Sequence, residues 1–222
     1  MNSTSFNSFI KALEQALAPP LPGSTAHDLL APEHRKDMLL LQPDISKALL
    51  SSVLILFYAD NKGKPNIIFT KRVEYKGVHS GQISFPGGKA EKTDKDIFET
   101  ALRETEEEIG LKRNDIQVIG ILSELYVPPS NFIIYPVVGT LYNKPVYKVD
   151  NKEVAKVISV PIEFFLKESS IGLHEVTTFE NLQFHVPGFM IENNLIWGAT
   201  AMILSELIMV VKNNTTLKSF FL

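Results

Sequence analysis

The sequence predicts an α+β fold in which a mixed β-sheet lies between helices, as an α/β/α sandwich. Short apolar runs typical of strands are followed by one amphipathic helix, then by further strands and a closing apolar helix. That order places helices and strands in separate layers. At ~150 residues per domain, the length of 222 residues indicates one domain with an extension.

Composition excludes several classes of protein. A net charge of −3 provides no field for holding a polyanion, so nucleic acid is not an expected partner. The absence of cysteine excludes disulfides, cysteine nucleophiles and thiolate zinc sites. No apolar run reaches the ~20 residues that span a bilayer, so no membrane contact is expected. The first residues lack a basic region before an apolar core, and we expect a cytoplasmic protein.

Residues 1–45 are expected to form a helical extension packed on the domain that residues 46–222 form. Apolar residues from Phe6 to Leu17 recur at helical spacing, and a Pro-rich stretch follows them. Leu49–Tyr58 and Ile67–Thr70, separated by a turn-rich spacer, predict a β-hairpin. The other expected elements are strands over Gln82–Phe85, Ile116–Leu125, Ile133–Tyr142, Glu153–Val160 and within residues 173–197, and a closing helix over Gly198–Val211.

The clearest helix is predicted over Asp94–Ile109, with Thr93 as N-cap and Gly110 just after its end. Apolar residues from Ile97 to Ile109 form its buried stripe. The carboxylates cluster near the C-terminal end, where the helix dipole disfavours negative charge. On a helical wheel they divide into a group at one edge of the stripe, Glu104, Glu107 and Glu108, and a single residue across the helix, Glu106.

Three crowded carboxylates require positive charge, and Arg103 alone cannot neutralise all of them. A hard divalent cation such as Mg²⁺ or Mn²⁺ accepts carboxylate oxygens while it binds phosphate oxygens. A solvated acidic face is the simpler alternative. The paired glycines Gly87 and Gly88, expected in a loop after a strand, would let a ligand approach the backbone.

At these residues the sequence resembles the Nudix hydrolases, whose box is written G-x5-E-x7-R-E-U-x-E-E-x-G-U with U aliphatic. Arg103–Leu111 matches the second half of the box, with Thr105 at the first U position. In the first half, Asp94 stands at the acidic position counted from Gly88, and eight residues rather than seven separate it from Arg103.

This longer spacing is similar to that of the coenzyme A pyrophosphatase branch. Ile67–Arg72 resembles the branch's L-L-T-x-R segment, and His79–Gly88 resembles its H-x-G-Q-x-x-F-P-G-G segment. Weaker similarity continues in Val186–Phe189 and Ile196–Ala201. The resemblance implies hydrolysis of coenzyme A or acyl-coenzyme A to 3′,5′-ADP and 4′-phosphopantetheine or its acyl derivative, with Mg²⁺ or Mn²⁺.

The resemblance also assigns roles, which we state as expectations. The metal ions would be bound by Glu104, Glu107 and Glu108. Arg103 would orient these glutamates through an ion pair. Glu153, at the head of a strand, is the first candidate for the general base, with Glu124 as a weaker one. The expected substrate contacts are Arg72, His79, Gln82, Gly87 and Gly88.

Three functions remain open from the sequence. The first is the coenzyme A diphosphatase, and the second is a Nudix hydrolase of ADP-ribose, a dinucleoside polyphosphate or a nucleoside triphosphate. The third is a non-catalytic nucleotide-binding protein, which the intact set of glutamates disfavours. The expected partner is a small nucleotide resembling coenzyme A, and a homodimer is an open alternative to a monomer.

Overall fold

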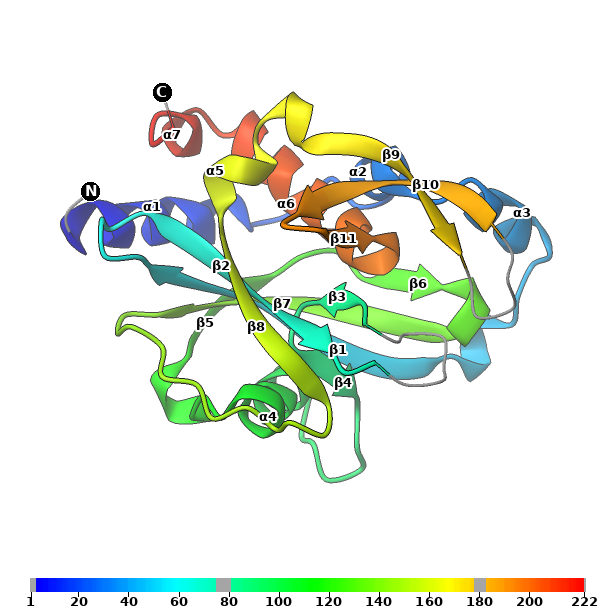
Figure 1. Cartoon of the computed structure of the whole chain (residues 1–222), viewed down its shortest axis with the longest axis horizontal. Helices are drawn as coiled ribbons and strands as arrows, with labels where there is room; N and C mark the ends of the chain where they lie inside the picture. Colours follow the sequence, from blue (N-terminus) through cyan, green and yellow to red (C-terminus); the bar gives the residue numbers. More distant parts are fainter. Residues whose placement is uncertain (1–2, 75–80, 178–182, 222) are drawn as a thin grey trace.

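The computed structural model describes residues 3–74, 81–177 and 183–221, and Figure 1 shows its layers. Within these residues the strands are β1 (Leu49–Ala59), β2 (Pro65–Arg72), β3 (Ile83–Ser84), β4 (Gly87–Lys89), β5 (Gln117–Ile121), β6 (Leu125–Val127), β7 (Phe132–Leu141), β8 (Val154–Pro161), β9 (Ile171–Thr177), β10 (Gln183–Ile191) and β11 (Asn194–Trp197). The helices are α1 (Ser3–Ala16), α2 (Ser24–His27), α3 (His34–Leu40), α4 (Ile97–Ile109), α5 (Ile162–Phe165), α6 (Gly198–Asn213) and α7 (Thr215–Lys218). None of the described helices is long and apolar enough to cross a membrane.

The main sheet is mixed and is built around β1. This strand pairs in parallel with β7 from Leu49 to Tyr58. Its other edge pairs antiparallel with β2 near Phe57 and with β4 near Ser52. The predicted hairpin of β1 and β2 is therefore confirmed. A parallel pair requires a crossover connection, and the segment between β1 and β7 contains α4 on one face of the sheet.

Helices cover both faces of this sheet, as the α/β/α prediction requires. Figure 1 shows α4 below the sheet and α1 and α6 above it. Side chains of β1 alternate between the two faces of the sheet. Leu54 and Leu56 pack in the core between the sheet and α4, whereas Ile55 and Phe57 pack in the core that α1 and α6 share. This alternation follows from the period of two residues in a strand. A separate antiparallel sheet consists of β9, β10 and β11.

The N-terminal helix shares the larger core. Phe9 of α1 is fully buried, and its ring centroid lies 5.8 Å from that of Phe57 in β1. Its ring also meets Phe220 and Phe221, each at 5.8 Å, near the other end of the chain. The helix that the sequence predicts here is confirmed. A domain boundary between residues 45 and 46 stays a prediction.

Two local predictions near the site are wrong. The central helix begins at Ile97 rather than Asp94, and its N-cap is Asp96, whose carboxylate accepts a hydrogen bond from the Glu99 N–H at 2.8 Å. Asp94 is unavailable for the helix because Arg103 binds its carboxylate. Gly87 and Gly88 lie in strand β4 rather than in a loop. The predicted helix end is confirmed, since Gly110 adopts a left-handed φ of 72°.

Candidate active site

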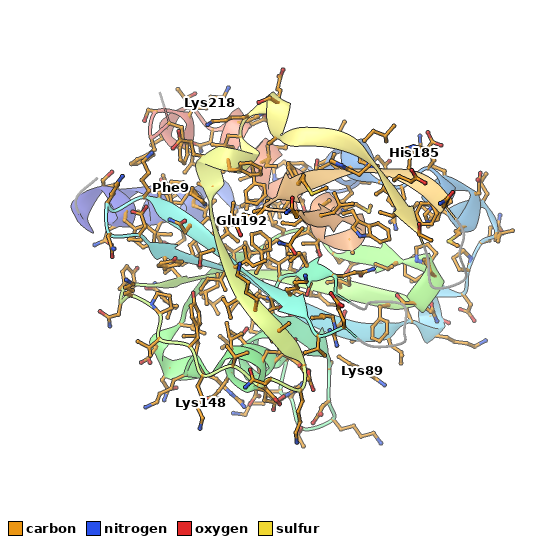
Figure 2. The ribbon with its side chains drawn as sticks, viewed as in Figure 1. Phe9, Lys89, Lys148, His185, Glu192 and Lys218 are labelled. Carbon is orange, nitrogen blue, oxygen red and sulfur yellow. The ribbon has the colours of Figure 1, made fainter. Side chains whose placement is uncertain are left out.

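The site forms where β4 packs against the C-terminal half of α4. A Cβ on Gly88 would lie 2.5 Å from the carboxyl carbon of Glu104, and one on Gly87 would lie 2.4 Å from the Ser52 carbonyl oxygen. Both contacts are closer than non-bonded atoms tolerate: backbone atoms exclude a side chain at Gly87, whereas at Gly88 a side chain would have to displace the carboxyl of Glu104. The paired glycines therefore let the helix carboxylates approach the sheet. Lys89, the next residue, points outward at the edge of the molecule (Figure 2).

Arg103 is the centre of the ion pairs. Its Nε and one terminal nitrogen donate to the two carboxylate oxygens of Asp94 at 2.8 and 2.9 Å, a bidentate geometry. The same terminal nitrogen donates to the Lys89 carbonyl at 3.0 Å. The other terminal nitrogen donates to Glu104 and Glu107, both at 3.0 Å. Hydrogen bonds from Arg103 hold the pKa of Asp94 far below its ordinary value.

Arg103 thus reaches two of the three glutamates predicted to bind metal. The Glu104 side chain is 16% exposed, and burial raises the pKa of Glu104 although Arg103 opposes the shift. The Glu107 side chain is 57% exposed and faces solvent beyond Arg103. The two carboxylates therefore differ in environment although one arginine joins them.

Glu108 is the most unusual carboxyl in the site. Its exposure is 4%, and one of its carboxylate oxygens is buried without a hydrogen-bond partner. Burial raises the pKa of Glu108 to about 8, and the charges of Glu104 and Glu153 add to the shift, while Arg72 opposes it. A buried acceptor without a partner is costly in a stable protein. The unpaired oxygen of Glu108 therefore has an open acceptor position at the site.

Glu106 lies on a different side of α4 from the other glutamates, as the helical wheel predicts. Its carboxylate accepts a hydrogen bond from Arg113 Nε at 2.7 Å. Its side chain is 40% exposed. Glu106 therefore belongs to a surface ion pair, as its position on the helical wheel predicts.

The segment after β7 brings Glu153 to the end of α4. The N–H groups of Lys148 and Asp150 donate to the last helix carbonyls, those of Ile109 and Glu108, both at 2.9 Å. Such bonds satisfy acceptors that a helix leaves open at its C-terminus, and Figure 2 shows Lys148 beside α4. The Glu153 N–H then donates to the Asp150 carbonyl at 3.1 Å. Glu153 is exposed at the start of β8, where its charge acts on Glu104 and Glu108.

The upstream segment contributes Arg72 and Gln82. Arg72 ends β2 and is opposite Val154 of β8, the residue that follows Glu153. Its N–H donates to the Gln82 carbonyl at 3.0 Å, and its charge acts on Glu108. The Nε atom of Arg72 is buried without a hydrogen-bond partner. His79, the remaining predicted contact, lies outside the described residues.

A hard cation fits the donors of this site. The buried unpaired oxygen of Glu108 and the raised pKa of Glu104 mark carboxyls whose burial the neighbouring arginines offset only in part. Within residues 3–74, 81–177 and 183–221, no group of three His, Cys, Asp or Glu side chains is gathered tightly enough to hold a metal ion. In this arrangement Arg103 binds Glu104 and Glu107. Metal binding by all three glutamates therefore stays a prediction that requires their side chains to turn.

Two residues in the region of the site were not identified from the sequence. The first is Asp94 as the anchor of Arg103, for which the acidic residue nine positions before the arginine was the available signal. The second is Tyr135, whose pKa is raised by burial and by the nearby carboxylate of Glu124. No local pattern indicated that pair, because the two residues meet only through strand pairing.

Comparisons with known proteins identify the family of this chain. A sequence model of the NUDIX domain matches residues 49–165. A protein named "Uncharacterized Nudix hydrolase NudL" from Photorhabdus laumondii is 36% identical over 146 residues, which cover 66% of this chain and 77% of that protein. The protein of the same name from Yersinia pestis strain Pestoides F is 35% identical over 148 residues, covering 65% and 71%. The solved MutT/nudix family protein from Enterococcus faecalis matches 80% of this chain and 69% of its own with a TM-score of 0.48 and 15% identity.

The protein is a hydrolase of the pyrophosphatase class, acting on a nucleoside diphosphate linked to another group. The chain belongs to the Nudix family. The resemblance drawn from Arg103–Leu111 is thereby confirmed, as is the α+β class. Nudix hydrolases generally use divalent metal ions such as Mg²⁺ or Mn²⁺, which agrees with the chemistry of Glu104 and Glu108.

Proposed function

We propose that this protein hydrolyses coenzyme A and its thioesters to 3′,5′-ADP and 4′-phosphopantetheine or its acyl derivative. The observation that supports this substrate is the backbone hydrogen bond from Arg72 to Gln82, together with the action of the Arg72 charge on Glu108. These two residues belong to the segments that resemble the coenzyme A pyrophosphatase branch. In this proposal the branch-specific segments contact the reacting diphosphate through Arg72.

In this proposal Glu104 and Glu108 are the principal metal ligands, and Glu107 completes the set. When bound, Mg²⁺ or Mn²⁺ neutralises charge on the diphosphate and lowers the pKa of a coordinated water. Arg103, anchored by Asp94, orients Glu104 and Glu107. Arg72 binds a phosphate oxygen through its guanidinium. Gly87 and Gly88 allow close approach, and His79 and Gln82 complete the predicted substrate contacts.

Glu153 is the proposed general base, which accepts the proton of the attacking water. It is exposed and is close enough for its charge to act on Glu104 and Glu108. The Glu153→Gln variant should lose most of kcat while its Mn²⁺ affinity stays unchanged. Glu168→Gln, an exposed glutamate of the segment after α5, is the matched control. Wild-type turnover by Glu153→Gln would exclude this residue as the base.

Incubation with Mg²⁺ or Mn²⁺ and a panel of coenzyme A, ADP-ribose, NADH and diadenosine polyphosphates tests the substrate. Release of 3′,5′-ADP from coenzyme A, with little turnover of the other compounds, is the expected result. Preferred turnover of ADP-ribose or a dinucleoside polyphosphate would assign the protein to another Nudix substrate class. Product chromatography distinguishes these outcomes and, run with each ion, compares Mg²⁺ with Mn²⁺.

Three further parts of the proposal concern the whole protein. Residues 1–45 form an extension of a hydrolase domain at 46–222, the protein acts in the cytoplasm, and a homodimer is the alternative to a monomer. Cell fractionation tests the location, and light scattering tests the oligomeric state.

A further inference from the structure

A row of four positions crosses the sheet next to the glutamates of α4. Gly88 of β4 pairs with Ser52 of β1, and Ser52 pairs with Tyr135 of β7. Glu124 precedes Leu125, which pairs with Ile134, so the register brings Glu124 opposite Tyr135. Paired residues of neighbouring strands point to the same face. Because the Cβ direction of Gly88 points at Glu104, the row lies on the face that carries α4.

The row is polar along its length. The carboxylate of Glu104 lies over Gly88, and the Ser52 hydroxyl donates to the Tyr135 carbonyl at 2.9 Å. Burial, and after it the nearby carboxylate of Glu124, raises the pKa of the Tyr135 hydroxyl, as the strand register that brings the two residues opposite each other leads us to expect. Tyr135 is half-buried, and Glu124 is exposed, so solvent reaches this end of the row. A carboxylate offers about four acceptor positions, and one hydroxyl leaves room for ligand donors.

The backbone that carries Glu124 is held on both sides. The Ser123 N–H and hydroxyl donate to the buried Glu206 carboxylate at 3.1 and 2.6 Å. Glu206 is itself anchored by the Gly23 N–H at 2.8 Å and by His27 at 3.0 Å. After Glu124 the chain enters β6, which pairs with β7. Pairing and the Glu206 anchor therefore fix the backbone position of Glu124, and a preorganised segment binds with less loss of entropy.

Charge differs between the two ends of the site. Arg72 and Gly88 come from strands on one edge of β1, whereas Tyr135 and Glu124 lie beyond the other edge. One end is thus cationic and the other carries an acceptor carboxylate. With strands ~4.8 Å apart, the Tyr135 backbone is about 10 Å from that of Gly88. This distance suits an extended organic group attached to a phosphate held at the glutamates.

We propose that Tyr135 and Glu124 bind the neutral arm of the substrate, which carries hydroxyl and amide N–H donors, while the phosphorylated nucleoside extends toward Arg72. The inference rests on the proposed function, since coenzyme A has both halves. Glu124 would repel the 3′-phosphate of the nucleotide half but accept hydrogen bonds from the hydroxyl and amides of the pantetheine half.

Calorimetric binding of the two product halves tests this orientation. The variants are Tyr135→Phe and Glu124→Gln, with Tyr142→Phe and Glu168→Gln as controls at exposed positions. We expect the Kd for 4′-phosphopantetheine to rise about five- to tenfold in each variant, as for the loss of one hydrogen bond. Affinity for 3′,5′-ADP should stay as in the wild type, and both controls should bind both compounds as the wild type does.

Kinetics provide an independent readout. For coenzyme A, KM should rise by a similar factor with kcat nearly unchanged, which is the pattern of lost uniform binding. A large fall in kcat for Glu124→Gln would instead make Glu124 a base and overturn the proposal. Weaker binding of 3′,5′-ADP, unchanged binding of both halves, or a wild type that binds neither half would also overturn it. If 4′-phosphopantetheine binding responds as expected but the wild type does not hydrolyse coenzyme A, the row is supported and the proposed function fails.

Discussion

Glu108 gives the metal-free protein a pH dependence that can be calculated and measured. Its pKa is raised from 4.5 to about 8, chiefly by burial. Between these two values the native state keeps a proton that the unfolded chain has released. Stability from this group is therefore complete below the unfolded pKa and is lost as pH rises through the folded pKa. The free energy of unfolding should fall by up to ~1.4 kcal/mol per pH unit across this window.

The same proton competes with a divalent cation for the carboxylate. Apparent metal affinity should rise by up to tenfold per pH unit until the pH reaches the pKa of about 8, where it levels off. Between pH 6 and 8 the ionised fraction rises from about 1% to about 50%, so the expected gain is about 50-fold. Titration of the metal-free protein with Mn²⁺ by electron paramagnetic resonance, at steps of pH across this range, measures the slope.

Two substitutions separate Glu108 from its neighbours. Glu108→Gln removes the titrating group, so the slope between pH 6 and 8 should disappear together with part of the affinity. Glu106→Gln removes a carboxylate from the opposite side of the helix and should keep the wild-type slope. A flat wild-type profile, or a Glu108→Gln variant with the full slope, would refute the reasoning from burial.

The remaining predictions concern the helix and its neighbours. Glu104→Gln should lower kcat by about 10²–10³-fold, as for lost transition-state electrostatics, whereas Glu106→Gln should change it little; equal effects in a steady-state assay would contradict the assignment of helix faces. Asp94→Asn leaves Arg103 buried without its bidentate partner, and urea denaturation should show that the free energy of unfolding falls by about 3 kcal/mol. Glu106→Gln breaks a partly exposed ion pair and should lower the same free energy by less than ~1 kcal/mol. Gly88→Ala displaces the Glu104 carboxyl, whose carbon would lie 2.5 Å from the new Cβ, so activity should fall strongly. The melting temperature should change little, because the displaced group is the end of a flexible side chain. A fully active variant would argue against this packing of Gly88 on Glu104.

The face of α4 could be predicted because helical periodicity is local. Thr105 is fully buried and Glu108 nearly so, whereas Glu106 faces Arg113 at the surface, as the helical wheel indicates. The end of the helix was predictable for the same reason, since Gly110 supplies the left-handed residue that a C-terminus needs.

The start of α4 could not be predicted from local signals. Thr93, Asp94 and Asp96 are all chemically able to cap a helix. Asp94 binds Arg103 and Thr100 instead, and Asp96 remains as the cap. The choice depends on a side chain nine residues away, so residue type alone did not distinguish the three.

Interactions between distant segments were also beyond the sequence. Arg72 and Glu153 could each be placed at the end of a predicted strand, but only the pairing of β2 with β8 brings them together. Glu206 binds Ser123 and His27, which lie 83 and 179 positions away along the chain, and no periodic signal connects residues so far apart.

The amino-acid order by itself determined the layered architecture, the helix that carries the glutamates and the family of the protein, because these depend on periodicity and on spacing within short segments. Tertiary structure decided which carboxyl is buried, which glutamate Arg103 leaves unpaired, and how Tyr135 meets Glu124 across the sheet. Burial and charge depend on the atoms that surround a group, and strands distant along the chain supply most of those atoms.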